Sequence, residues 1–150
     1  MAKKSKQVKT AFSVPTSPVK TPKLEAGPDF YKLRPVWRFA RLEMCAPFGW
    51  HEIGREKLIE VHAKLSELEA LTWYEILLIR KHLNHSVEVY QLNKAARDRL
   101  AELGLDDYEE LTSLRLSGPE RIWGIPQLGA FTLLWWDPHH RVYDYELPNT

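Results

Sequence analysis

The region that most constrains the fold is residues 111–147, where short apolar runs alternate with turn signals at 117–120, 126–129 and 137–140. In the run that follows Gly129, strand alternation predicts two sets of side chains on opposite faces. One set is Phe131, Leu133 and Trp135, and the other is Thr132, Leu134 and Trp136. A run that is apolar on both sides is expected to be a central strand. The region therefore predicts an antiparallel meander of three or four strands, with the last strand over 142–147.

Upstream of the meander, the apolar pattern changes from a strand-like to a helical period. Val36–Met44 alternates as a half-buried strand does, whereas the apolar residues of 58–68 recur at the spacing of an amphipathic helix. A second helix is expected to begin at Thr72, which forms a capping box with the glutamate three residues later. A third is expected over 92–103, ended by a glycine. This order predicts an α+β fold, with two to three helices packed on one face of a mainly antiparallel sheet.

Composition and charge divide the chain into two parts. Residues 1–30 are rich in Lys, Ser, Thr and Pro and lack a sustained apolar period, so we expect a disordered basic arm. Residues 31–150 are long and apolar enough to form a single α+β domain. The first 32 residues carry a formal charge of +5 and the remainder −4. A dedicated nucleic-acid-binding domain is usually basic, so the charge alone does not indicate one.

Several classes of protein are not expected from this composition. The basic start is not followed by the apolar core of a secretory signal, and no apolar stretch is long enough to span a bilayer. We therefore expect a cytoplasmic protein with no membrane partner. The single cysteine, Cys45, excludes an internal disulfide and is expected to be a small buried side chain.

The chain carries no strong catalytic signature, because it has no glycine-rich phosphate loop, nucleophile elbow or dinucleotide-binding fingerprint. Its six histidines include the adjacent pair His139 and His140. A metal site at that pair would need a third ligand, such as Asp137 or Glu120. Adjacent histidines in a turn are more often solvated, so we expect neither a metal nor another cofactor.

Three arginines, Arg115, Arg121 and Arg141, fall on consecutive segments of the predicted meander. Residues so spaced can line up across antiparallel strands and bind a phosphate group through several hydrogen bonds. The alternative is that these arginines form ion pairs between strands. The carboxylates available for such pairs are those of Glu120, Asp137 and Asp144.

Three proton-transferring side chains, those of His139, His140 and Tyr143, follow in the same region. Histidine and tyrosine can act as general acid or base, while arginine stabilises charge on the oxygens of phosphorus. The sequence therefore offers His139, His140 and Tyr143 as candidate catalytic residues for phosphodiester chemistry, with the three arginines as phosphate ligands.

Several segments resemble a group of small bacterial proteins that are often found with mobile elements. The segments are LTSLRLSGPERIWGI (111–125), FTLLWWDPHHRVY (131–143), RPVWRF (34–39), TWYEI (72–76) and NKAARDRL (93–100). More distantly, the layout is similar to the RelE/ParE-type toxins of bacterial toxin–antitoxin systems. Some of those toxins cleave mRNA on the ribosome, and others poison DNA gyrase.

The resemblance implies a toxin-type protein that acts on RNA or the translation machinery, with an antitoxin as partner. It implies an endoribonuclease-like activity in which Leu114–Gly118 and Glu120–Trp123 form a hairpin. The late functional positions of that family would then be occupied by Arg121, His139, His140, Arg141 and Tyr143. The alternative is a non-catalytic adaptor or inhibitor that binds a protein through the aromatic sheet face or through a sheet edge.

Overall fold

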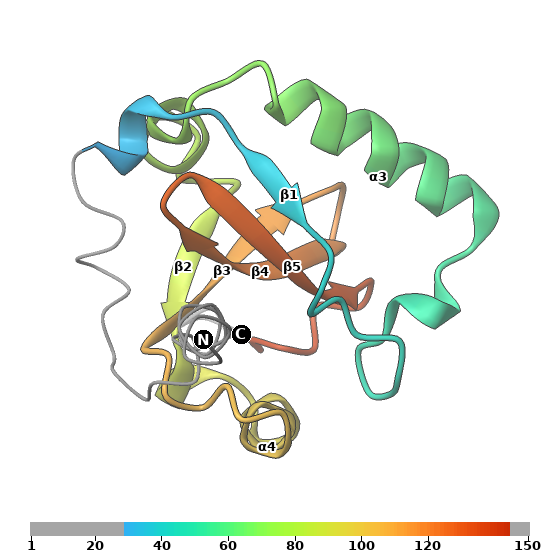
Figure 1. Ribbon diagram of the computed structural model, residues 1–150. Coiled ribbons are helices and arrows are strands. Elements are labelled where there is room, and N and C mark those ends of the chain that lie inside the picture. Colours follow the sequence, from blue (N-terminus) through green and yellow to red (C-terminus); the bar gives the residue numbers. More distant parts are fainter. Residues whose placement is uncertain (1–28, 145–150) are drawn as a thin grey trace, which may run out of the picture.

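The computed structural model describes residues 29–144 and has an α+β fold with a five-stranded mixed sheet (Figure 1). The strands are β1 (Val36–Arg38), β2 (His85–Glu88), β3 (Glu110–Arg115), β4 (Arg121–Gln127) and β5 (Ala130–Asp137). Their order across the sheet is β1-β5-β4-β3-β2, with β1 parallel to β5 and every other pair antiparallel. The meander predicted from the sequence is β3–β5.

Two predicted segments fall largely outside the described residues. The basic arm expected over 1–30 is one of them, since only its last two residues are described. The strand expected over 142–147 is the other, and its described part, 142–144, is not a strand.

The helical elements of the described residues connect β1 to β2 and β2 to β3, or precede β1. They are η2 (Phe30–Lys32), η3 (Trp50–Glu52), α3 (Arg55–Leu68), the π-helical turn η4 (Tyr74–Ile79), η5 (Val89–Gln91) and α4 (Lys94–Glu102). The predicted capping box is confirmed, because the Thr72 amide donates to Glu75 Oε1 (2.9 Å) and the Glu75 amide donates to Thr72 Oγ1 (3.3 Å). The element that follows is a short π-helical turn and not the longer helix expected.

The helix predicted over 92–103 is confirmed as α4, and its end has a clear cause. Gly104 adopts φ +74°, which costs a glycine little because it has no Cβ. This turn lets the Leu105 amide donate to the Leu100 carbonyl (2.8 Å) and the Gly104 amide donate to the Ala101 carbonyl (3.1 Å). Both bonds go to carbonyls near the end of the helix, as is usual where a left-handed glycine ends one.

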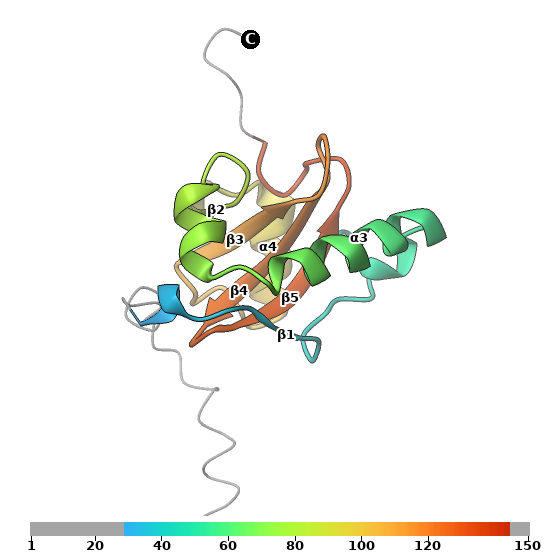
Figure 2. The same ribbon diagram turned by 90° about the horizontal axis from the view of Figure 1, so that it is seen from above.

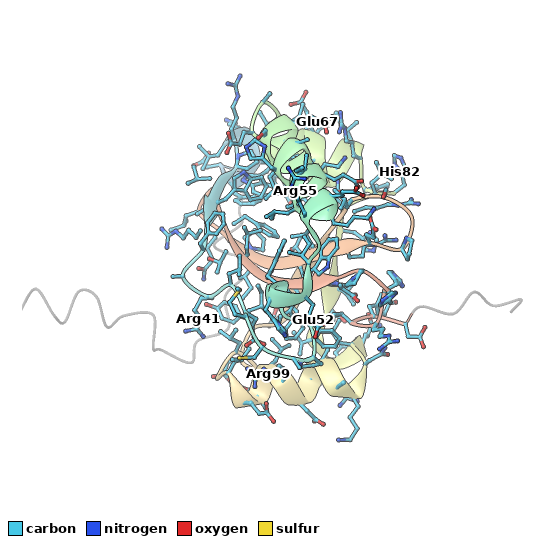
Figure 3. The ribbon with its side chains drawn as sticks, turned by 90° about the vertical axis from the view of Figure 1, so that its right-hand side faces the viewer. Arg41, Glu52, Arg55, Glu67, His82 and Arg99 are labelled. Atoms are coloured by element: carbon cyan, nitrogen blue, oxygen red, sulfur yellow. The ribbon has the colours of Figure 1, made fainter. Side chains whose placement is uncertain are left out.

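Helices cover both faces of the sheet, whereas the sequence predicted helices on one face (Figure 3). On one face, α3 contributes Val61 and Leu65 to the core, and η4 contributes Ile76, together with Trp73 just before it. On the other face, α4 contributes Ala96 and Leu100. The reason is that β4 and β5 are apolar on both sides, so a single helical layer would leave half of their side chains in water.

Because β5 contains a bulge, its side chains do not alternate between the two faces as predicted. Trp123 pairs with Trp135, but the next residue of β4, Gly124, pairs with Leu133, so Leu134 is an extra residue on β5. Trp135 therefore packs on the α4 side with Leu134, while Leu133 packs on the α3 side. The prediction that Leu133 and Trp135 share a face was wrong for this reason.

The chain after β1 was predicted to remain a strand to Met44, but it leaves the sheet after Arg38. It crosses the end of β5, where the Glu43 amide donates to the Leu134 carbonyl (2.9 Å). The Glu43 carboxylate is buried and accepts two hydrogen bonds from the Arg99 guanidinium, at 2.7 and 2.8 Å. These bonds from Arg99 hold the pKa of Glu43 below its ordinary value. Cys45, predicted to be buried, is exposed on this loop.

Candidate phosphate-binding groove

A buried carboxylate fixes the turn that carries the predicted histidines. Asp137, the last residue of β5, is 1% exposed. Its Oδ1 accepts the amide of Arg141 (2.8 Å), and its Oδ2 accepts the amide of Val142 (3.0 Å) and the indole N–H of Trp123 (3.1 Å). His140 adopts φ +59°, a left-handed conformation that histidine tolerates better than most residues. The left-handed residue reverses the chain and brings the two amides to the carboxylate.

The segment after this turn is held against the start of α4. The Asn93 amide donates to the Val142 carbonyl (2.9 Å), and Asn93 Nδ2 donates to the Arg141 carbonyl (2.7 Å). Val142 is fully buried in the core on the α4 side of the sheet. The bonds at Arg141 and Val142 therefore fix the backbone between His140 and Tyr143.

Two of the three predicted arginines lie side by side across β3 and β4. Arg115 and Arg121 are partners in the antiparallel register, so their side chains share a face of the sheet. Both guanidiniums donate to the carbonyl oxygen of Gly118, from Arg115 Nε (3.2 Å) and from an Arg121 terminal nitrogen (2.7 Å). The β3–β4 turn thus draws two positive charges together.

Within residues 29–144, neither arginine forms an ion pair with the carboxylates that the sequence offered, those of Glu120, Asp137 and Asp144. Asp137 does lie opposite Arg121 in the register of β4 and β5, and its charge opposes the lowering of the Arg121 pKa. Glu120 instead pairs with Lys57 (2.8 Å) and accepts a hydrogen bond from Ser117 (2.8 Å). Asp137 is occupied by Trp123 and the two backbone amides. Both guanidiniums therefore keep hydrogen-bond donors for an anionic ligand.

A groove of about 350 Å³ lies where these side chains meet the edge strand β2. We call it the sheet-end groove. Its lining residues are His85, Ser86, Val87, Gln91, Arg121, His140 and Tyr143. Arg115 lies next to it through its pairing with Arg121. The groove is therefore lined by one arginine, two histidines and a tyrosine, and a second arginine lies beside it.

Burial and neighbouring charges both shift the pKa values of side chains that line the groove. Burial lowers the pKa of His140, and the positive charge of Arg121 lowers it further, against the opposing effects of Asp137 and Asp144. Burial and the neighbouring Arg115 likewise lower the pKa of Arg121, although a guanidinium remains charged at neutral pH. The lowered pKa favours the neutral imidazole of His140, which is the form in which histidine acts as a general base.

Besides Arg115, two of the predicted site residues do not line this groove. His139 and Arg141 are exposed and do not line it. His85 does line it, although the sequence did not single it out as a candidate catalytic residue. Its position follows from the register of β2 on β3, where His85 pairs with Ser113, and no local pattern in the sequence indicates that pairing.

Two further findings concern the described part of the chain only. Residues 29–144 hold no group of three or more His, Cys, Asp or Glu side chains arranged to bind a metal ion. None of the helices in this part combines the length and apolar character that a bilayer crossing requires.

A scan of protein-family models and searches of curated proteins and solved structures find no match to this chain.

Proposed function

We propose that the protein binds the phosphodiester backbone of RNA in the sheet-end groove and acts as a RelE-like, toxin-type endoribonuclease. The observation that carries the proposal is the pair Arg115 and Arg121, which converge on one carbonyl while, within residues 29–144, neither donates a hydrogen bond to a carboxylate. Holding two guanidiniums together costs electrostatic energy that a bound phosphate would recover. The neighbouring His140 and Tyr143 add groups that can move protons.

The groove contains the parts needed for cleavage of RNA by its own 2′-hydroxyl. Neutral His140 accepts the proton of the 2′-hydroxyl as the bond from that oxygen to phosphorus forms. The bond from phosphorus to the 5′ oxygen breaks, and Tyr143 donates a proton to this leaving group. The products are a 2′,3′-cyclic phosphate and a free 5′-hydroxyl, and Arg121 stabilises the charge on the other phosphorus oxygens meanwhile.

The charge distribution supports a local site better than a broad binding surface. The chain beyond residue 32 has a formal charge of −4, so the cations of the groove act within an acidic domain. The lysines of residues 1–32 add an attraction to nucleic acid that does not depend on sequence and weakens with salt. An antitoxin that occupied the groove or its rim would block the activity.

The alternative, a non-catalytic protein-binding module, loses one of its two expected surfaces. Trp123, Trp135 and Trp136 are each at most 4% exposed, so the aromatic residues of the meander form core and not a binding face. A sheet edge remains for such a module.

The adjacent histidines provide a matched test of the proposed function. We expect induced expression of the native chain in a bacterial host to arrest growth and to leave RNA fragments with 2′,3′-cyclic phosphate ends. His140→Ala should abolish both effects, whereas His139→Ala, a change of the same size on the same turn, should preserve them. Circular dichroism would confirm that both variants are folded.

Two outcomes would overturn the assignment. Growth arrest that survives both His140→Ala and Arg121→Ala would place the activity elsewhere in the molecule. A purified native chain that leaves RNA intact and does not arrest growth would exclude the endoribonuclease reading and favour the protein-binding module.

A further inference from the structure

The sheet edge opposite the groove exposes apolar side chains that no described element covers. β1 is the last strand at this edge, and β2 is the last strand at the opposite edge (Figure 2). The groove is lined by residues of β2. Val36 is 61% exposed and Phe39 is 63% exposed, and neither contributes to the core. Exposed apolar groups that gather on one part of a surface often mark a contact with another molecule.

The β4–β5 turn adds a leucine to this edge at a cost in backbone strain. Leu128 and Gly129 have φ of +52° and +88° and form a two-residue hairpin turn that favours asparagine and glycine. Leu128 is nevertheless 74% exposed. Leu33 packs over Gly129, where an added Cβ would lie 2.7 Å from Leu33 Cδ1. Leu33 and Gly129 therefore meet beside β1, and Leu128, the residue before Gly129, is left largely exposed to solvent.

Within residues 29–144, β1 pairs only with β5, so the backbone groups on its other side are open to a further strand. The Val36 amide donates to the Gly129 carbonyl, so the backbone amide and carbonyl of Val36 face β5. Because successive residues of a strand point their amide and carbonyl groups to opposite sides, those of Trp37 face away from β5. Pro35 has no amide to donate, so the open stretch is short. An edge of this kind accepts an extended peptide as one more strand.

The charge of this edge indicates what kind of peptide it accepts. Lys32, Arg34 and Arg38 are exposed, and the stretch 30–42 contains no acidic residue. Within the described residues, none of these three cations forms an ion pair. Charge on a short edge disfavours pairing with a second copy, because the same cations would meet across it. Residues 1–28 are disfavoured likewise, since they carry six lysines against one glutamate.

We propose that this edge binds an extended segment of another protein in which carboxylate side chains alternate with apolar ones. We call it the β1 edge surface, formed by Leu33, Arg34, Val36, Arg38 and Leu128. The segment pairs with the outward backbone groups of Trp37, and its carboxylates bind Arg38 and the nearby Arg34 on the face of β1 that Val36 shares. Its apolar side chains lie on the opposite face of the extended sheet, because side chains alternate along a strand. The inference does not depend on the RNA site, because the two surfaces lie at opposite edges of the sheet.

The test uses short fluorescent peptides in which Glu or Lys alternates with Val. Fluorescence anisotropy at low salt measures binding of each peptide to the full chain. We expect the Glu peptide to bind about tenfold or more tightly than the Lys peptide, and Arg34→Glu with Arg38→Glu to reverse that preference. Arg121→Ala should leave binding of the Glu peptide unchanged, which separates this edge from the groove. Amide NMR shifts should change at Trp37 and Phe39.

Three results would overturn the proposal. The first is equal affinity for the two peptides, or binding of neither. The second is loss of Glu-peptide binding in Arg121→Ala, which would mean that the peptide occupies the groove. The third is a dimer of the free chain in sedimentation measurements that Val36→Asp dissociates, which would assign the edge to a second copy.

Discussion

Replacing Asp137 tests whether the turn that carries His140 depends on a single buried carboxylate. Asp137→Ala removes the acceptor for three donors: the indole N–H of Trp123 and the amides of Arg141 and Val142. Asp137→Asn is the milder change. Its amide oxygen can replace Oδ2, which accepts two of the bonds, but its NH2 group then faces the Arg141 amide, which is also a donor.

The expected losses follow from the number of donors left without an acceptor. A buried donor without a partner costs about 1–3 kcal/mol, so Asp137→Asn should lower the free energy of unfolding by about 1–3 kcal/mol. Asp137→Ala leaves three such donors, and because the turn can open partly to water we expect a loss of about 3–5 kcal/mol. Since domains are stable by only about 5–15 kcal/mol in total, the alanine variant should be close to unfolding.

Urea unfolding followed by circular dichroism measures these differences. The matched control is Asp98→Asn, which removes the same charge from an exposed pair with Lys94 and should change stability by about 0–1 kcal/mol. In Asp137→Asn, hydrogen exchange should accelerate at the Arg141 and Val142 amides first. If the asparagine and alanine variants are equally stable, or if both match the control, the reasoning about the three donors is refuted.

Three further predictions concern other parts of the chain. An added Cβ at Gly124 would lie 2.2 Å from the Phe131 ring, so Gly124→Ala should lower stability by about 1–3 kcal/mol in urea unfolding, and a neutral result would contradict the geometry. Thr72→Ala removes one half of the capping box with Glu75 and should cost about 1 kcal/mol in the same assay, whereas an unchanged midpoint would show that the box is dispensable. Because burial and Arg121 lower the pKa of His140, the folded state binds fewer protons there than the unfolded state, and stability should fall as pH drops below about 6.5. An imidazole NMR titration with a pKa at or above about 6.5 would contradict this sign.

Local sequence patterns predicted most of the elements but not how the sheet is completed. The helix over 92–103, its glycine end and the capping box at Thr72 depend on residues within one or two turns of each other, and all three are confirmed. The prediction that Trp135 shares a face with Leu133 was wrong, because β5 has a bulge at Leu134, whose carbonyl accepts a hydrogen bond from the Glu43 amide. Such a contact, between residues far apart in the chain, leaves no mark on the period of β5.

The candidate site shows the same limit. The sequence predicted that arginines of consecutive strands could align, and Arg115 and Arg121 do. It left open whether carboxylates would neutralise them, and that depends on Glu120 reaching Lys57 of α3 and on Asp137 turning to backbone amides. The sequence also could not place His85 at the groove, because the register of β2 on β3 joins segments separated by α4.

The measurement that tests the central claim most directly is binding of a short single-stranded RNA by native, Arg121→Ala and Arg141→Ala chains. Fluorescence anisotropy over a series of salt concentrations would give the affinities. Arg121 lines the groove and Arg141 is exposed outside it, so we expect about a tenfold or greater loss for Arg121→Ala and less than about a twofold loss for Arg141→Ala. Equal losses in the two variants, or no binding by the native chain, would contradict the account of the groove as a phosphate site.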